Sequence, residues 1–76
     1  MREWLFEARK AKGLTQLEVA KKLDISEQYY CFIEKGERQK RMDLALASRL
    51  SAIFGISVKR IVEMEKEWRE QKKGEA

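Results

Sequence analysis

Two short segments with the apolar spacing of amphipathic helices are separated by only three residues, Asp24, Ile25 and Ser26. Residues 16–23 and residues 27–35 each place apolar side chains three or four positions apart, which is the period of one helix face. A connection of three residues is too short to lay two helices antiparallel, so it predicts that they cross steeply. This pair of segments constrains the fold more than any other feature of the chain.

The ends of the two segments carry capping residues. Thr15 and Glu18 have the spacing of a capping box at the start of the first segment, and Ser26 is a favourable N-cap for the second. Gly36 follows the second segment, where a residue in the left-handed conformation commonly ends a helix. These signals mark the ends of two predicted helices.

Three further helices are predicted around this pair. An apolar stripe covers residues 2–12 and stops at Gly13. Asp43 is a candidate N-cap for a helix over residues 44–54, and a last helix is expected from residue 58 to about residue 73. The predicted fold class is all-α, with five helices.

The chain has 76 residues, which is enough for one small domain. A domain of this size buries only roughly 60% of the surface of its unfolded chain, so its core is thin and an all-helical fold is favoured. We expect the domain to cover residues 1–65. Residues 66–76 are expected to form a charged helical C-terminal extension and tail.

The composition excludes several classes of function. The chain has no histidine and a single cysteine, Cys31, so neither an internal disulfide nor a cysteine-rich metal site is expected. Cys31 is interpreted as a small packing residue, with redox sensing as the alternative. No apolar run approaches the roughly 20 residues of a membrane span, and the first residues lack a signal-peptide pattern. We therefore expect a cytoplasmic protein that is not an enzyme and uses no cofactor, metal or membrane.

The positive charge of the chain is concentrated at one place. The formal net charge of +4 favours a polyanionic partner only weakly. Residues 35–41, KGERQKR, however, contain four cations and one anion and directly follow the second helix of the steeply crossed pair. The major groove of DNA, about 12 Å wide, accommodates one helix, so these cations would lie beside the phosphates if that helix entered the groove.

The spacing of apolar residues over 16–35 is that of a helix-turn-helix. The small residue Ala20 lies where a larger side chain would prevent the two helices from crossing closely. The apolar positions that are expected to hold the two helices together are Val19, Leu23, Ile25, Tyr30 and Ile33.

Longer matches extend this pattern along most of the chain. The segments EARKAKGLTQLEVAKKL, IS, YY and IEKGER, and later LALASRLSAIFGIS, lie within residues 5–63. In these segments the chain resembles the phage-repressor and Cro-type (XRE-like) family of helix-turn-helix DNA-binding proteins. The resemblance implies a lambda-repressor-like domain that binds double-stranded DNA as a homodimer. It also implies a sequence-specific transcriptional regulator of bacterial or phage origin, associated with the nucleoid, with repression at a palindromic operator as the expected mode.

The chain departs from the family pattern at several positions. Asp24 stands where the family commonly has a turn glycine, and aspartate tolerates the left-handed region better than most residues. The loop KGERQKRM is longer than the usual loop and lacks its proline. Its path over DNA is therefore expected to differ from that of the family.

The outward face of the helix over 27–35 supplies the candidate base contacts, which are Glu27, Gln28 and Phe32. Gln28 can pair with adenine through both groups of its amide. Glu27 either accepts from a cytosine amino group or only stabilises the start of its helix. Phe32 either touches thymine methyl groups or packs on the loop that follows.

The candidate phosphate contacts lie around the same helix. Gln16 resembles the phosphate-binding glutamine of the family, and the free N–H groups at the start of its helix add to an anion site. Tyr29 either donates to a phosphate or is merely exposed. The full set of predicted phosphate contacts is Gln16, Tyr29, Lys35, Arg38, Lys40 and Arg41.

Two other groups of residues have expected structural roles. Arg9 and Glu34 match a family pair that forms an ion pair between the first and third helices. The candidate dimer contacts are Phe6, Met64 and Trp68. The alternative for Trp68 is that it folds back on the first helix near Trp4.

A competing hypothesis keeps this fold but gives it another partner. The face formed by Glu27, Tyr29 and Phe32 could bind a protein instead of DNA, although such a module has little need for the basic loop. A third possibility keeps DNA binding but assigns the chain to an antitoxin or a restriction-system controller.

Overall fold

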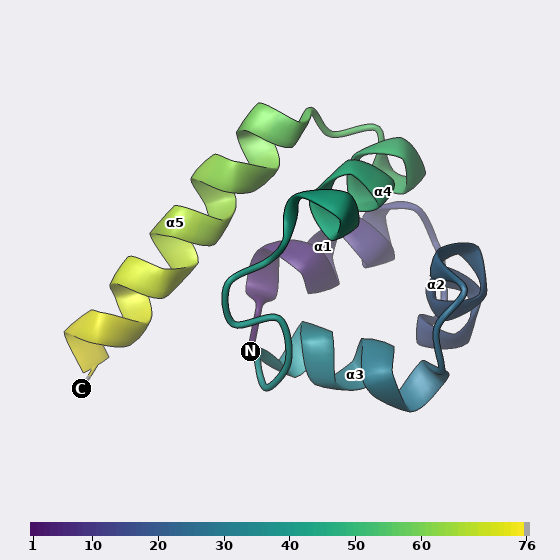
Figure 1. The fold of residues 1–76 in the computed structure, drawn as a ribbon, viewed down its shortest axis with the longest axis horizontal. Helices are drawn as coiled ribbons and strands as arrows, with labels where there is room; N and C mark the ends of the chain where they lie inside the picture. Colours follow the sequence, from purple (N-terminus) through teal and green to yellow (C-terminus); the bar gives the residue numbers. More distant parts are fainter. Residues whose placement is uncertain (76) are drawn as a thin grey trace.

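The structure, a computed structural model, describes residues 1–75, with side chains described through residue 71. The helices are α1 (Glu3–Ala11), α2 (Gln16–Leu23), α3 (Glu27–Lys35), α4 (Leu44–Phe54) and α5 (Val58–Glu75). Residues 1–75 contain no strand. Figure 1 shows α1 to α4 grouped around a common centre, while α5 lies along one side of the molecule. The prediction of an all-α, five-helix fold is confirmed.

The predicted N-caps are present. The Thr15 hydroxyl accepts from the Glu18 backbone N–H at 3.1 Å, and the Thr15 N–H donates to the Glu18 carboxylate at 2.8 Å, which completes the capping box. The backbone hydrogen bond that the Glu18 carboxylate accepts from Thr15 lowers the pKa of this exposed group. The other side chains that accept the N–H three residues ahead are Ser26, Asp43 and Ser57.

The turn between α2 and α3 has the predicted left-handed residue. Asp24 adopts φ 59° and ψ 45°, and the N–H of Ile25 donates to the Ala20 carbonyl at 3.0 Å. Arg49 of α4 donates to the Leu23 carbonyl at 3.1 Å, so α4 also holds the end of α2. In Figure 1, α3 lies across the view and α2 runs steeply to it, as the short turn predicts.

The core is built from all five helices. It contains Leu5, Val19, Ala20, Leu23, Tyr30, Ile33, Ala47, Leu50, Phe54 and Ile61. Two positions with inward apolar spacing are not buried: Leu17 is 44% exposed and Val62 is 55% exposed. The buried stripe on each of these two helices is therefore narrower than its apolar pattern.

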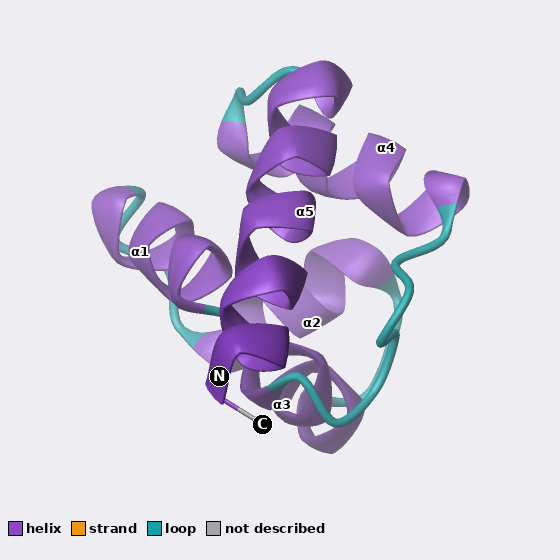
Figure 2. Ribbon diagram, turned by 90° about the vertical axis from the view of Figure 1, so that its left-hand side faces the viewer, coloured by secondary structure: helices purple, strands orange, loops and turns teal. Residues whose placement is uncertain are grey.

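Helix α5 extends well beyond Ile61, its residue in the core. Figure 2 shows it passing in front of the other helices from the α4 end of the molecule to the α3 end. It continues without interruption past residue 65, and Trp68 in its second half is only 6% exposed. Among the described residues, no helix combines the length and the apolar character that crossing a membrane requires.

Candidate nucleic-acid interface

One face of α3 is anchored and the other is free. Tyr30 and Ile33 are completely or almost completely buried, and burial raises the pKa of the Tyr30 hydroxyl. Glu27 and Gln28, one turn earlier, are exposed. The helix is therefore fixed against α2 while the first two candidate base contacts project from it.

Phe32 is only half-buried, and it contacts the loop after α3. The Arg38 guanidinium lies 5.7 Å from the centre of its ring, within the range of a cation–π contact. Part of the ring therefore packs on the loop, and the rest of the ring is exposed on the outer face of α3.

Tyr29 is also half-buried and is linked to the loop. Its hydroxyl accepts a hydrogen bond from the Gln39 side chain at 3.1 Å. Because a hydroxyl can donate as well as accept, the Tyr29 proton is still available for a phosphate oxygen.

An ion pair joins α1 to the end of α3. Arg9 donates to the two oxygens of Glu34 at 2.8 and 3.0 Å, which is a bidentate arrangement. Burial by itself would raise the pKa of Glu34, but hydrogen bonds led by those from Arg9 outweigh it and lower that pKa. The same contact raises the pKa of Arg9.

Gln16 lies against this ion pair. Its side-chain amide donates to a Glu34 oxygen at 3.3 Å, and the residue is half-buried. An amide nitrogen carries two N–H groups, so the second can still donate to a phosphate beside the start of α2.

The predicted cations lie at the end of α3 and on the loop of residues 36–43, which Figure 1 shows running from α3 to α4 on the side of α5. In the part of the chain that the structure describes, none of their charged groups belongs to an ion pair. All four are exposed: Lys35, Arg38, Lys40 and Arg41. The free face of α3 thus ends beside a group of exposed, unpaired positive charges within the described residues.

The three dimer candidates differ in exposure. Phe6 is 36% exposed and has the Arg9 guanidinium 5.3 Å from its ring centre, and Met64 is half-buried. Trp68 is buried by residues of its own chain, and its indole N–H donates to the Met1 carbonyl at 2.8 Å. It folds back towards the N-terminal residues, which was the alternative interpretation.

Sequence reasoning missed two residues near the loop. The apolar stripe of residues 2–12 predicts Arg2 as the first residue of a helix, but Arg2 precedes α1 and its side chain is completely buried. Glu65, which no sequence pattern distinguishes from the other charged residues of α5, is buried and pairs with Arg2 at 2.6 Å. No local pattern indicates this pair, because its members lie 63 positions apart. No cluster of metal-ligating side chains occurs in the described portion of the chain.

The fold and the free α3 face define a class of protein. A family model described as helix-turn-helix matches residues 5–61, which is most of the chain. The chain belongs to this family of helix-turn-helix DNA-binding proteins, of the phage-repressor and Cro type. This membership agrees with the expectation that the chain is not an enzyme.

A particular relative extends the comparison. Over 39 residues the chain is 51% identical to the HTH-type transcriptional regulator YqaF of Bacillus subtilis (strain 168). The aligned part covers 51% of this chain and 51% of that protein, so the match spans about half the length of the curated relative. No solved structure matches the chain.

Proposed function

We propose that the chain is a sequence-specific transcriptional regulator that places α3 in the major groove of double-stranded DNA and represses transcription. The observation that carries this proposal is the free face of α3, which ends beside four exposed cations. A helix held this way can approach base edges while the cations approach the phosphates on its flank. The likeness to an HTH-type transcriptional regulator supports the regulatory role.

The contacts divide into two kinds. Glu27, Gln28 and the open edge of Phe32 are proposed to read base edges. The groups proposed to bind phosphates carry little sequence information and set the register of the domain on DNA. They are Gln16, Tyr29, Lys35, Arg38, Lys40 and Arg41.

Affinity favours a homodimer on a palindromic operator. Non-specific binding to DNA has a Kd near 10⁻⁴–10⁻⁶ M, whereas specific regulators reach roughly 10⁻⁸–10⁻¹¹ M. Two α3 helices related by a two-fold axis, reading half-sites about 34 Å apart or a multiple of that, would close this gap. Phe6 and Met64 remain the proposed dimer contacts, since Trp68 is buried within its own chain. We place this homodimer in the cytoplasm, on the nucleoid.

The domain division is also part of the proposal. We propose that residues 1–65 form the domain, with the helix-turn-helix and every proposed DNA contact, and that residues 66–75 extend α5 as a charged helical tail. Residue 76, which was included in the predicted tail, lies outside the described residues. The packing of Trp68 means that this extension supports the domain instead of projecting freely from it.

Selection of bound sites from a pool of random duplexes tests the proposal. We expect a single palindromic sequence to be enriched, with two half-sites separated by a whole number of helical turns. Enrichment of an asymmetric site would contradict the two-fold arrangement. If the pool shows no enrichment and random duplexes are not bound even at low ionic strength, DNA binding itself is wrong.

A protein-binding module is the second candidate. The half-exposed aromatic residues Tyr29 and Phe32 on α3 favour it, because aromatic side chains are enriched at protein interfaces. Retention on immobilised heparin separates the two candidates. A DNA-binding protein should elute with a steep dependence on salt, whereas a protein-binding module should elute early.

A further inference from the structure

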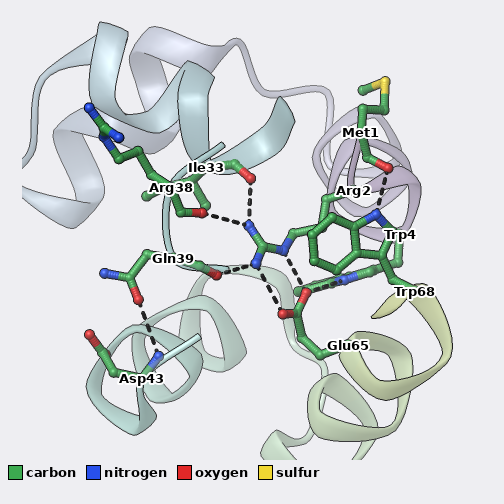
Figure 3. A network of polar contacts seen from close by, with 9 residues as sticks. All are labelled: Met1, Arg2, Trp4, Ile33, Arg38, Gln39, Asp43, Glu65 and Trp68. Carbon is green, nitrogen blue, oxygen red and sulfur yellow. Dashed lines mark hydrogen bonds and ion pairs between the residues drawn. The ribbon is translucent and has the colours of Figure 1, made fainter. Parts of the chain in front are cut away.

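A buried arginine lies at the junction of the N-terminal residues, α3, the following loop and α5. Arg2 has no exposed surface, and its guanidinium forms a bidentate pair with Glu65 of α5, at 2.6 and 3.1 Å. Figure 3 shows this guanidinium pointing between the end of α3 and α5. None of the DNA contacts proposed above includes either residue.

The same guanidinium also binds the backbone at the end of α3 and in the loop. It donates to the carbonyls of Ile33 at 2.6 Å, of Arg38 at 3.3 Å and of Gln39. A guanidinium is planar, and its N–H groups point in fixed directions, so it specifies where these three carbonyls lie relative to one another. Arg2 therefore determines the path of the loop as it leaves α3.

Gln39 shows how closely this path is controlled. It has φ 54°, a left-handed conformation that is uncommon for residues other than glycine. Besides the bond from Arg2 to its carbonyl, its side chain donates to the Tyr29 hydroxyl at 3.1 Å and accepts from the Asp43 N–H at 3.2 Å. These contacts hold the middle of the loop against α3 and the start of α4.

Helix α5 supports Arg2 from the other side. Glu65 also accepts from the Trp4 indole at 2.8 Å, and the Trp68 ring lies 4.5 Å from the Arg2 guanidinium. Trp68 further touches the residue that ends α3, because a Cβ atom added to Gly36 would lie 2.6 Å from the indole ring. Figure 3 shows Glu65 and Trp68 of α5 flanking Arg2.

We propose that Arg2, held by Glu65 and Trp68, is a positioning residue that sets the loop of residues 36–43 in the conformation in which its cations reach DNA phosphates. The inference rests on the proposed function. It adds that α5, which carries none of the proposed DNA contacts, controls the affinity of the protein for the DNA phosphate backbone through the buried side chain of Arg2. Arg38 is positioned most directly, because Arg2 binds its carbonyl while its guanidinium lies over Phe32.

Two substitutions on α5 test the inference with the same change of charge. Glu65→Gln removes an acceptor of Arg2, whereas Glu63→Gln, the matched control, removes an exposed carboxylate that pairs with Arg60 of the same helix. Binding of the full chain to a random-sequence duplex is measured by fluorescence anisotropy over a range of NaCl concentrations. Circular dichroism first identifies a temperature at which both variants are folded.

The two substitutions should have different effects on the affinity for DNA. Loss of a negative charge alone should leave DNA binding unchanged or slightly tighter, and we expect this for Glu63→Gln. For Glu65→Gln we expect about five- to tenfold weaker binding at low salt. The slope of log K against log [NaCl] should also be shallower, by roughly the contribution of one phosphate contact. Equal affinities and equal slopes for the two variants would overturn the inference.

A double-variant cycle distinguishes positioning from general destabilisation. Arg41→Ala should weaken binding several-fold in the wild-type chain, but by less than about twofold in the Glu65→Gln chain, because a displaced loop has already lost that contact. An equal effect in both backgrounds would show that the loop is not positioned by this network. If Glu65→Gln does not fold, Trp68→Phe, which keeps a ring over Arg2 but loses the indole N–H, takes its place in the same cycle.

The wild-type measurement separates this inference from the proposed function. If the wild-type chain ignores the duplex at low salt, the proposed function fails, and the positioning role fails with it. If the wild-type chain binds with a steep salt dependence and Glu65→Gln behaves like Glu63→Gln, only the positioning role is wrong.

Discussion

Gln28 and Arg41 are both exposed, but they are expected to act on DNA in different ways. Gln28 lies in the first turn of α3, where a side-chain amide can pair with the edge of adenine. Arg41 lies on the loop after α3, where we propose that its guanidinium approaches the phosphate backbone. Sequence discrimination and overall affinity should therefore be separable by single substitutions.

We predict that Gln28→Ala lowers the discrimination between the selected site and a site with one changed base pair by about 1–3 kcal/mol. Arg41→Ala should weaken binding to both sites by a similar factor. Competition binding with the two duplexes measures both effects. A change of base preference in Arg41→Ala, with unchanged non-specific affinity, would contradict the assigned role of the loop.

The lowered pKa of Glu34 predicts that the stability of the fold depends on pH. Because its pKa is lower in the folded chain than the ordinary value of about 4.3, it stabilises the fold above that pH, and the contribution is lost as the pH falls through its folded pKa. Glu34→Gln should therefore reduce the free energy of unfolding at pH 7, by up to about 3–5 kcal/mol, since it leaves Arg9 poorly compensated.

Urea unfolding at pH 7 and near pH 3 measures this effect. The wild-type chain should lose more stability between the two pH values than the Glu34→Gln chain does. Glu63→Gln, at an exposed position of α5, should retain the acid sensitivity of the wild type. Equal acid sensitivity in all three chains would show that Glu34 does not contribute through its carboxylate.

At the scale of the elements, the glycines that end α1 and α3 have different surroundings. Gly13 and Gly36 both have positive φ, at 68° and 84°. A Cβ atom on Gly13 would meet nothing within 4 Å, whereas one on Gly36 would overlap the ring of Trp68. The first position requires glycine for its backbone alone, and the second also requires it for the contact between α3 and α5.

We predict that Gly13→Ala costs about 1–2 kcal/mol, the order of the penalty for a side chain in the left-handed region. Gly36→Ala should cost more, because the ring of Trp68 or the end of α3 must also move. Thermal or urea unfolding of the two variants gives the difference directly. Equal costs would mean that α5 does not press on the end of α3.

At the scale of the whole molecule, α5 is part of the compact body. The radius of gyration is 11.7 Å, close to the roughly 11.4 Å that a compact domain of this length has. Helix α5 therefore packs on the domain through Glu65 and Trp68, which close the network around Arg2.

We predict that a chain ending at residue 65 loses about 3–5 kcal/mol of stability, the order found when a buried tryptophan is truncated to alanine. The full-length Trp68→Ala chain should lose a similar amount, and Val62→Ala, at an exposed site on the same helix, should lose little. Urea unfolding monitored by circular dichroism compares the three. A stable chain of residues 1–65 would show that the extension is dispensable for the fold.

The sequence by itself determined the five helices, the N-caps of α2, α3 and α4, the left-handed turn at Asp24 and the core contacts between α2 and α3. These features depend on apolar spacing and on hydrogen bonds between residues a few positions apart, so local sequence is sufficient to predict them. It also identified the free face of α3 and the cations beside it, because a helix with two known inward residues has a known outward face.

Only the tertiary structure decided how the loop after α3 is held. The pair of Arg2 with Glu65 and the contact of Trp68 with Gly36 join segments whose proximity no local pattern encodes. This buried ion pair joins opposite ends of the chain, so it forms only when the five helices have packed together. The physical reason is that the two charges attract each other strongly only where water is excluded and the geometry is bidentate, and both conditions are properties of the folded molecule.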